Sequence, residues 1–272
     1  SSAASDVYKR QDIDVAWLKR YERFLRERGN SDNTMGIRFR TLRAVYNKAI
    51  EDDIVDEKYY PFKKFKVSHF NKKTTKRAIS KSEMAKVLAL DLSNITTYYS
   101  PLLYLSKDLF VFSYLGCGIN MIDMAYLTYS NIIDDRICFK RHKTGQGITF
   151  RLLPQTIEII NKYKNEGYSL SDYIFPILDK KFHITEIQQY DRIRKVTKGV
   201  NRNLKKIGSF LGLNIPLTTY VARHSFATVL KRSGVNVAII SEALGHTSLS
   251  TTQFYLDSFD NEQIDDAMKN LL

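Results

Sequence analysis

The stretch from Leu217 to Leu256 constrains this chain more than any other segment. It holds Arg223 at the start of an amphipathic run, His246 directly after a Leu-Gly pair, and Tyr255 nine residues after that histidine. A guanidinium, an imidazole and a phenol are all groups that can bind a phosphate or react with it. Short helices and turns between them are expected to bring the three side chains toward one point. We therefore predict a phosphate-reacting site with Tyr255 as nucleophile.

The charge balance points to a polyanionic partner. Lys and Arg number 42 against 29 Asp and Glu, a formal net charge of +13. This excess favours a nucleic acid partner, and the alternative is a soluble protein that is merely basic. Cys117 and Cys138 have neither metal-ligand spacing nor the pattern of a disulfide framework, which favours a reducing cytoplasm. No apolar run approaches the ~20 residues of a membrane span, so no membrane partner is expected.

The amino-terminal part is predicted to be a small helical domain. Apolar residues recur at helical spacing in residues 15–28 and again in residues 33–51. Residues 1–11 are left out of this fold prediction. The opposite face of the second helix carries Arg38, Arg40 and Arg43, which are candidate contacts to DNA phosphates. The alternative for this basic face is simple solvation.

A basic stretch follows. Residues 58–82 contain nine Lys or Arg and no Asp or Glu, and residues 68–75 lack helical periodicity. We interpret this stretch as an interdomain linker that can follow a DNA backbone, against the alternative of a solvated tether. The candidate DNA contacts in it are Lys63, Lys64, Lys66, Lys72, Lys73, Lys76 and Arg77.

A second, mixed domain is predicted from the pattern after residue 78. Ser80 and Glu83 form a capping-box signature, and helices are expected at 101–115, 121–127, 155–165 and 185–211, the last with a weak point near Gly199. Residues 137–143 and 148–152 read as the two strands of a hairpin, with Arg141 and Lys143 on one strand face. The predicted fold class is mainly α with a small β-sheet (α+β).

The carboxyl-terminal motifs resemble those of the tyrosine recombinases, or phage-type integrases. That family has H-x-x-R-H, then L-G-H, then a tyrosine nine residues later; the chain has TTYVARHSFAT and LGHTSLSTTQFYL. The sequences of these two motifs are most similar to those in recombinases of Bacteroides-type mobile elements. The resemblance covers about residues 15–257. It implies a helical core DNA-binding (clamp) domain at 12–66, a basic linker at 67–77, and a catalytic domain of the DNA breaking-rejoining type at 78–272.

The resemblance also implies a mechanism. Tyr255 would attack the scissile phosphate, form a 3′-phosphotyrosine and release a 5′-hydroxyl. The covalent intermediate conserves the energy of the phosphodiester, so neither ATP nor any other cofactor is needed. A free phenol has a pKa of about 10, so ionising it at neutral pH costs roughly 4 kcal/mol that neighbouring groups must offset. Arg223 and His246 would stabilise the charge on phosphorus, Lys143 would act as general acid, and no metal is expected.

Two positions depart from the family pattern. Tyr220 stands where the family has a histidine, and Asn120 stands where it has its first arginine. A phenol is a poorer base than an imidazole at pH 7, and an amide removes a positive charge from the phosphate site. Our hypothesis is that Arg141 replaces the missing arginine.

The sequence also leads to predictions about the oligomeric state, and two other functions are left open. The resemblance implies a homo-tetramer on double-stranded DNA, a monomer when free, strand exchange through a Holliday junction, and docking of residues 261–272 on a neighbouring subunit. Some members carry a further arm-binding domain ahead of the clamp, and none is expected within this sequence. The alternatives are a type IB topoisomerase-like relaxase, and a non-catalytic DNA-binding protein favoured by Asn120 and Tyr220.

Overall fold

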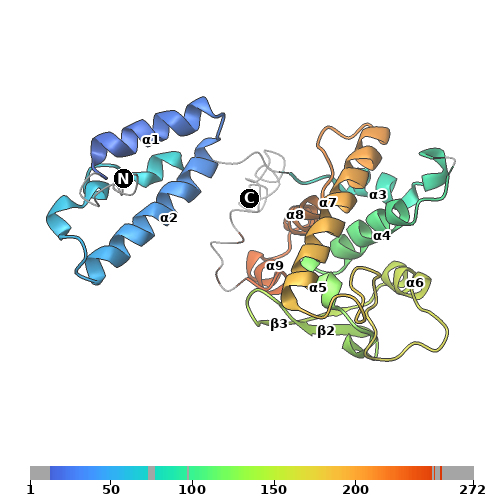
Figure 1. The fold of residues 1–272 in the computed structure, drawn as a ribbon. Coiled ribbons are helices and arrows are strands. Elements are labelled where there is room, and N and C mark those ends of the chain that lie inside the picture. Colours follow the sequence, from blue (N-terminus) through green and yellow to red (C-terminus); the bar gives the residue numbers. More distant parts are fainter. Residues whose placement is uncertain (1–12, 73–76, 97, 247, 249–251, 253–272) are drawn as a thin grey trace, which may run out of the picture. The chain divides into compact units, whose positions relative to one another are not determined.

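The computed structural model describes residues 13–72, 77–96, 98–246, 248 and 252. The chain divides into two compact units, residues 1–75 and 76–272, which are coloured blue and green to red in Figure 1. Each unit is described by itself below.

The first unit is built on two helices, α1 (Val15–Glu27) and α2 (Asp32–Glu51), as the sequence predicted. Each begins at a side-chain cap that satisfies an otherwise unpaired backbone amide: Asp14 accepts from the Trp17 amide, and Ser31 accepts from the Thr34 amide. Their apolar stripes form one core, which includes Leu18, Leu25, Met35, Phe39 and Tyr46.

Part of the basic stretch also packs into this core. Residues 57–70 form three short 3-10 turns, η2 (Glu57–Tyr59), η3 (Pro61–Lys63) and η4 (Val67–Phe70). The Phe65 and Phe70 rings lie 5.0 and 4.9 Å from the Phe39 ring. Lysines alternate with these buried aromatics and stay exposed. The segment interpreted as a linker therefore packs against the helical unit as far as Phe70.

The second unit surrounds the apolar helix α4 (Pro101–Leu115), against which α7 (Glu186–Phe210) and α8 (Thr219–Arg232) both pack (Figure 1). Its other helical elements are α3 (Lys81–Ala89), η5 (Leu92–Asn94), α5 (Met121–Tyr126), η6 (Tyr129–Asn131), α6 (Pro154–Lys162), α7 (Glu186–Phe210), α8 (Thr219–Arg232) and α9 (Val237–Ala243). The capping box predicted for Ser80 and Glu83 is present at α3.

The helix α7 shows no break at Gly199, so the predicted weak point is wrong. A Cβ at this position would lie 2.9 Å from the Leu102 Cδ2 atom. The glycine therefore permits the close approach of α7 to α4, and the packing offsets its poor helix propensity.

A three-stranded antiparallel sheet in the order β1-β2-β3 completes the second unit, with β1 (Ile132–Ile133), β2 (Arg136–Lys140) and β3 (Gly147–Arg151). The mainly helical fold with a small sheet is thus confirmed.

The first strand of the predicted hairpin ends three residues earlier than expected. The last paired residues are Lys140 and Gly147. A turn follows in which the Arg141 amide donates to the Gln146 carbonyl and Gly145 adopts a φ of +69°. Arg141 and Lys143 both lie in this turn, so the prediction that they share a strand face is wrong. Arg141 is buried and Lys143 is exposed.

Candidate active site

Arg223 lies in the second turn of α8 and is only 5% exposed. Its Nη1 donates to the Gly118 carbonyl (2.7 Å), and its Nη2 donates to the Leu244 carbonyl (2.6 Å). Gly118 has a φ of +65°, and a Cβ there would lie 2.9 Å from the Arg223 Cγ. The Gly-Cys-Gly turn after α4 therefore leaves room for this side chain and fixes its guanidinium.

Arg141 reaches the same carbonyl group from the hairpin. It is 9% exposed, and its Nη1 donates to the carbonyls of Leu244 (2.9 Å) and Gly245 (3.1 Å). Gly245 follows α9 with a φ of +62°, and a Cβ there would lie 2.6 Å from the Arg141 Cδ. Only glycine fits this position, and its presence lets two guanidiniums meet at the Leu244 carbonyl.

Asp123 supports Arg141 from the opposite side. It is 4% exposed, its Oδ2 lies 3.5 Å from the Arg141 Nε, and its Oδ1 accepts from the His142 amide at 2.8 Å. Asn120 caps α5 and accepts from the Asp123 amide at 3.0 Å. Among the described residues, Asn120 hydrogen-bonds to neither arginine, and it caps the helix that carries the Asp123 carboxylate.

His246 follows Gly245 and lies half-buried between two partners. Its Nε2 is 3.0 Å from the Arg223 Nη2, and its Nδ1 is 2.7 Å from the Thr252 Oγ1. Burial, followed by the charges of Arg223 and Arg141, lowers the pKa of His246 from 6.5 to about 4. The imidazole is therefore neutral at physiological pH.

The remaining predicted catalytic residues are placed differently. Lys143 is exposed in the hairpin turn. Tyr220 is 49% exposed on α8, with its ring edge-on to His224 at 4.4 Å. Tyr255 lies outside the described residues. The structure thus brings together Arg223, His246 and Arg141.

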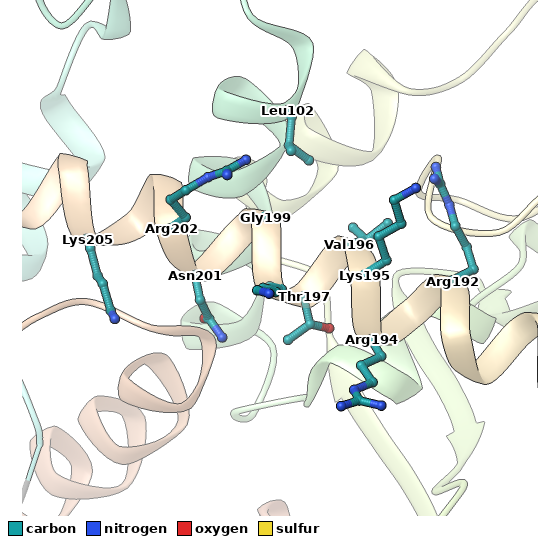
Figure 2. Close-up of a pocket in the computed structure, with 11 residues that line it drawn as sticks. Leu102, Arg192, Arg194, Lys195, Val196, Thr197, Gly199, Asn201, Arg202 and Lys205 are labelled. Atoms are coloured by element: carbon teal, nitrogen blue, oxygen red, sulfur yellow. The ribbon is translucent and has the colours of Figure 1, made fainter.

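A basic groove runs along α7, which the sequence prediction did not single out. Figure 2 shows Arg192, Lys195 and Arg202 on the side of Leu102, and Arg194 and Lys205 on the opposite side of the helix. Lys198 also lines the groove. Residues 192–210 contain no Asp or Glu, the same signal that identified the basic stretch after residue 58. That signal would have identified this groove as a candidate phosphate-binding surface.

The predicted DNA contacts of the first unit are largely exposed. Arg38, Arg40 and Arg43 are exposed on α2, and the Arg40 Nη1 lies 3.3 Å from the Asn71 Oδ1. Lys63 is exposed and pairs with Glu57 at 2.9 Å. The other exposed cations of the basic stretch are Lys64, Lys66, Lys72 and Arg77. Lys73 and Lys76 lie outside the described residues.

Neither a metal cluster nor a membrane span is found in the described part of the chain. No group of three His, Cys, Asp or Glu residues there is arranged to hold a metal ion. Among the described helices, none combines the length and the apolar character needed to cross a bilayer.

Comparison with known proteins identifies the family to which this pair of units belongs. Residues 91–262 match the phage integrase family, and residues 5–67 match the phage integrase SAM-like domain. The chain therefore belongs to the phage integrase family.

Curated relatives include tyrosine recombinases of thermophiles. One from Pseudothermotoga lettingae is 28% identical over 195 residues, which cover 70% of this chain and 59% of the relative. The recombinase XerA of Thermococcus kodakarensis is 27% identical over 249 residues, covering 90% and 77%. A Thermosipho africanus recombinase is 36% identical over 137 residues, or 49% of this chain and 43% of the relative. The chain thus spans about half the length of the first and last of these proteins.

Solved structures share the fold. The XerH recombinase in a post-cleavage complex with a palindromic difH substrate has a TM-score of 0.67 at 19% identity, covering 95% of this chain and 72% of XerH. The Tn1549 transposon integrase in complex with circular intermediate DNA has a TM-score of 0.61 at 17% identity, covering 94% and 85%.

Proposed function

We propose that this protein is a site-specific DNA recombinase that cleaves and rejoins DNA through a covalent 3′-phosphotyrosine intermediate and a Holliday junction. The observation that carries the proposal is the meeting of Arg223 and Arg141 at the Leu244 carbonyl, with His246 beside them. A pentacoordinate phosphorus gains negative charge on its nonbridging oxygens. Two fixed guanidiniums in a partly buried site stabilise that charge far better than mobile surface cations do.

The proposed roles follow from this arrangement. Tyr255 attacks phosphorus: an O–P bond forms to the phenolic oxygen, the phenolic proton passes to solvent water, and the bond to the 5′ oxygen breaks. Lys143 in the exposed hairpin turn supplies the proton to the leaving 5′ oxygen, and Tyr220 donates a hydrogen bond to the phosphate. Arg141 replaces the first family arginine, and Asn120 caps the helix that carries Asp123, the carboxylate partner of Arg141. The chemistry is proposed to need no metal or other cofactor.

Double-stranded DNA is the proposed substrate, held by a clamp domain and a catalytic domain. The predicted boundaries are 12–66, 67–77 and 78–272, and we extend the clamp to Phe70 because Val67 and Phe70 pack into its core. The basic face of α2, the exposed lysines after it and the groove on α7 supply the phosphate contacts. The XerH and Tn1549 proteins were solved with DNA, which supports this choice of substrate.

The proposal extends to the oligomeric state of the protein and to the group of recombinases from which it comes. We propose a homo-tetramer on DNA and a monomer when free, with residues 261–272 docking on a neighbouring subunit. A lambda integrase was solved as a dimer on a core site, which supports assembly on DNA. We also propose that the chain belongs to the recombinases of Bacteroides-type mobile elements and acts in the bacterial cytoplasm.

A covalent trapping experiment tests the function. The protein is expected to form an adduct with a nicked duplex from which the short fragment bearing the released 5′-hydroxyl diffuses away after cleavage, because the broken strand then cannot rejoin. The adduct is measured on a denaturing gel, with Tyr255→Phe as the control that lacks the attacking oxygen. A purely DNA-binding protein would shift the DNA and give no adduct. Relaxation of supercoiled DNA without paired sites would favour the topoisomerase-like alternative.

The groove on α7 gives a prediction about salt dependence. The double variant Lys195→Gln, Arg202→Gln removes two exposed cations from the same side of the helix. If both contact DNA phosphates, the slope of log K against log salt should become shallower by about 1.8, since each neutralised phosphate contributes about 0.9. Fluorescence anisotropy at several salt concentrations measures the slope. The matched control is Lys86→Gln, Lys181→Gln, which removes two exposed lysines of the same unit outside the groove and the basic stretch. Equal slopes for both double variants would contradict the groove assignment.

A further inference from the structure

Thr252 takes no part in the proposed mechanism, yet its hydroxyl contacts a residue of the candidate active site. Its side chain is fully buried, and its hydroxyl lies between His246 and Ser241, which is itself only 4% exposed. The Thr252 hydroxyl donates to the Ser241 Oγ at 2.8 Å, and the same oxygen lies 2.7 Å from the His246 Nδ1. A buried hydroxyl is costly unless its hydrogen-bonding capacity is used, and here it is used on two sides.

The direction of these hydrogen bonds determines where the imidazole carries its proton. A threonine hydroxyl has one hydrogen, and Thr252 donates it to Ser241. Toward His246 the oxygen can therefore only accept, so Nδ1 must carry a hydrogen. On the other side of the ring, Nε2 faces the Arg223 Nη2 at 3.0 Å. A guanidinium has donors and no acceptor, so Nε2 must be unprotonated. Two independent contacts thus require the same tautomer.

We infer that Thr252 is a positioning residue whose hydroxyl fixes His246 as the Nδ1–H tautomer, so that Nε2 accepts a hydrogen bond from Arg223 and orients its guanidinium. In this state Nε2 has no proton to donate to a phosphate. In this state the imidazole acts through Arg223, whereas the sequence predicts that His246 itself stabilises the charge on phosphorus. The consequence for DNA cleavage rests on the proposed function, whereas the tautomer itself does not.

The contact between Thr252 and His246 also links two parts of the proposed active site, because Thr252 lies close to Tyr255 in the sequence. Thr252 stands three residues before Tyr255, and Ser241 lies on α9 directly before the Leu-Gly-His turn. The chain from Ser241 through Thr252 and His246 to Arg223 is therefore one continuous hydrogen-bonded path. It ties the segment that leads to the nucleophile to the same arginine that is proposed to bind the phosphate. A hydrogen-bonded partner of this kind orients a functional imidazole.

The tautomer can be observed directly by NMR. In a 15N-labelled sample at pH 7, the two ring nitrogens of a neutral histidine give different shifts depending on which carries the hydrogen. A His246→Asn sample identifies the signals of this residue among the five histidines. We expect the Nδ1–H form in the wild-type protein and in Thr252→Ser, and a mixture or the Nε2–H form in Thr252→Val. An Nε2–H wild type, or an unchanged tautomer in Thr252→Val, would overturn the inference.

The cleavage consequence is tested with the same variants. Thr252→Val keeps the shape of the side chain and removes the hydroxyl. We expect the adduct to form roughly 10- to 100-fold more slowly, by analogy with metal-bound histidines that lose the partner orienting them. Thr252→Ser should keep most of the rate. Thr156→Val on α6 is the matched control, because it removes another buried hydroxyl. Equal rates for the two valine variants, or loss of activity in Thr252→Ser equal to that in Thr252→Val, would overturn the positioning role.

The two levels of the proposal can fail separately. A wild-type protein that gives no adduct while His246 shows the Nδ1–H form contradicts the proposed function and supports the tautomer. A wild-type protein that forms the adduct while His246 shows the Nε2–H form contradicts the role of Thr252 and supports the function.

Discussion

Replacing Arg223 by alanine is expected to slow covalent adduct formation about a thousandfold or more, the range found when an arginine that stabilises a transferring phosphoryl group is removed. The guanidinium is 5% exposed and is held by Gly118, Leu244 and His246, so no mobile cation can take its place in the same geometry. The rate is measured from single-turnover adduct formation on the nicked duplex. DNA affinity is measured in parallel and should change much less, because the remaining phosphate contacts persist.

Two further variants separate the chemistry of Arg223 from its structural role. Arg223→Lys keeps the charge and loses the planar fork, so it should stay well below the wild-type rate. Arg151→Ala removes an exposed arginine of the same unit that pairs with Asp135, and it should cleave normally. Thermal unfolding of each variant shows how much stability is lost, because Arg223→Ala leaves two buried carbonyls without this donor. Normal cleavage by a folded Arg223→Ala protein would exclude the proposed site.

Local signals in the sequence were sufficient to predict most of the secondary structure. The capping box at Ser80 fixes the start of α3 because the cap and the third helical residue satisfy each other's backbone amides. The helices α1 and α2 follow from apolar stripes that are long enough to be unambiguous. These features depend on residues close in the chain, so they can be read without the fold.

The errors occurred where a distant contact decides the local structure. The hairpin looks as if its first strand runs to Lys143, yet pairing ends at Lys140 because Arg141 turns inward to Leu244, which is 103 residues away. Residues 58–82 were predicted to be a linker because they hold many lysines and no acidic residue, yet Phe62, Phe65 and Phe70 within this stretch are buried in the core of the first unit. Gly199 looked like a helix break because nothing in its own segment reveals the close approach of Leu102.

The candidate site was predictable in part for the same reason. The spacing of Arg223 and His246 indicated that they act together, and the structure places them in contact. The sharing of the Leu244 carbonyl by two arginines depends on a main-chain atom, which no residue pattern reveals. The placement of Asp123 against Arg141 likewise depends on how α5 packs against the hairpin turn.

Arg141 carries the second large prediction, because the sequence lacks the first arginine of the family. Arg141→Ala is expected to slow adduct formation about 100-fold or more, the loss expected when one donor to a developing oxyanion is removed. Its guanidinium lies against Leu244, the carbonyl that also binds Arg223, so both positive charges act at one place. Arg151→Ala in the same hairpin is the matched control. If Arg141→Ala cleaves nicked substrates as well as the wild type, the replacement hypothesis is wrong.

A double variant distinguishes lost chemistry from lost stability. Arg141→Ala leaves the buried Asp123 carboxylate without its cation, and breaking such a pair costs about 3–5 kcal/mol of unfolding free energy. Adding Asp123→Asn removes that unpaired charge while the amide oxygen can still accept from the His142 amide. The double variant should therefore regain stability in thermal unfolding and still cleave slowly. Recovery of both properties together would mean that Arg141 serves the fold of the hairpin, and the missing family arginine would then have no replacement at this position.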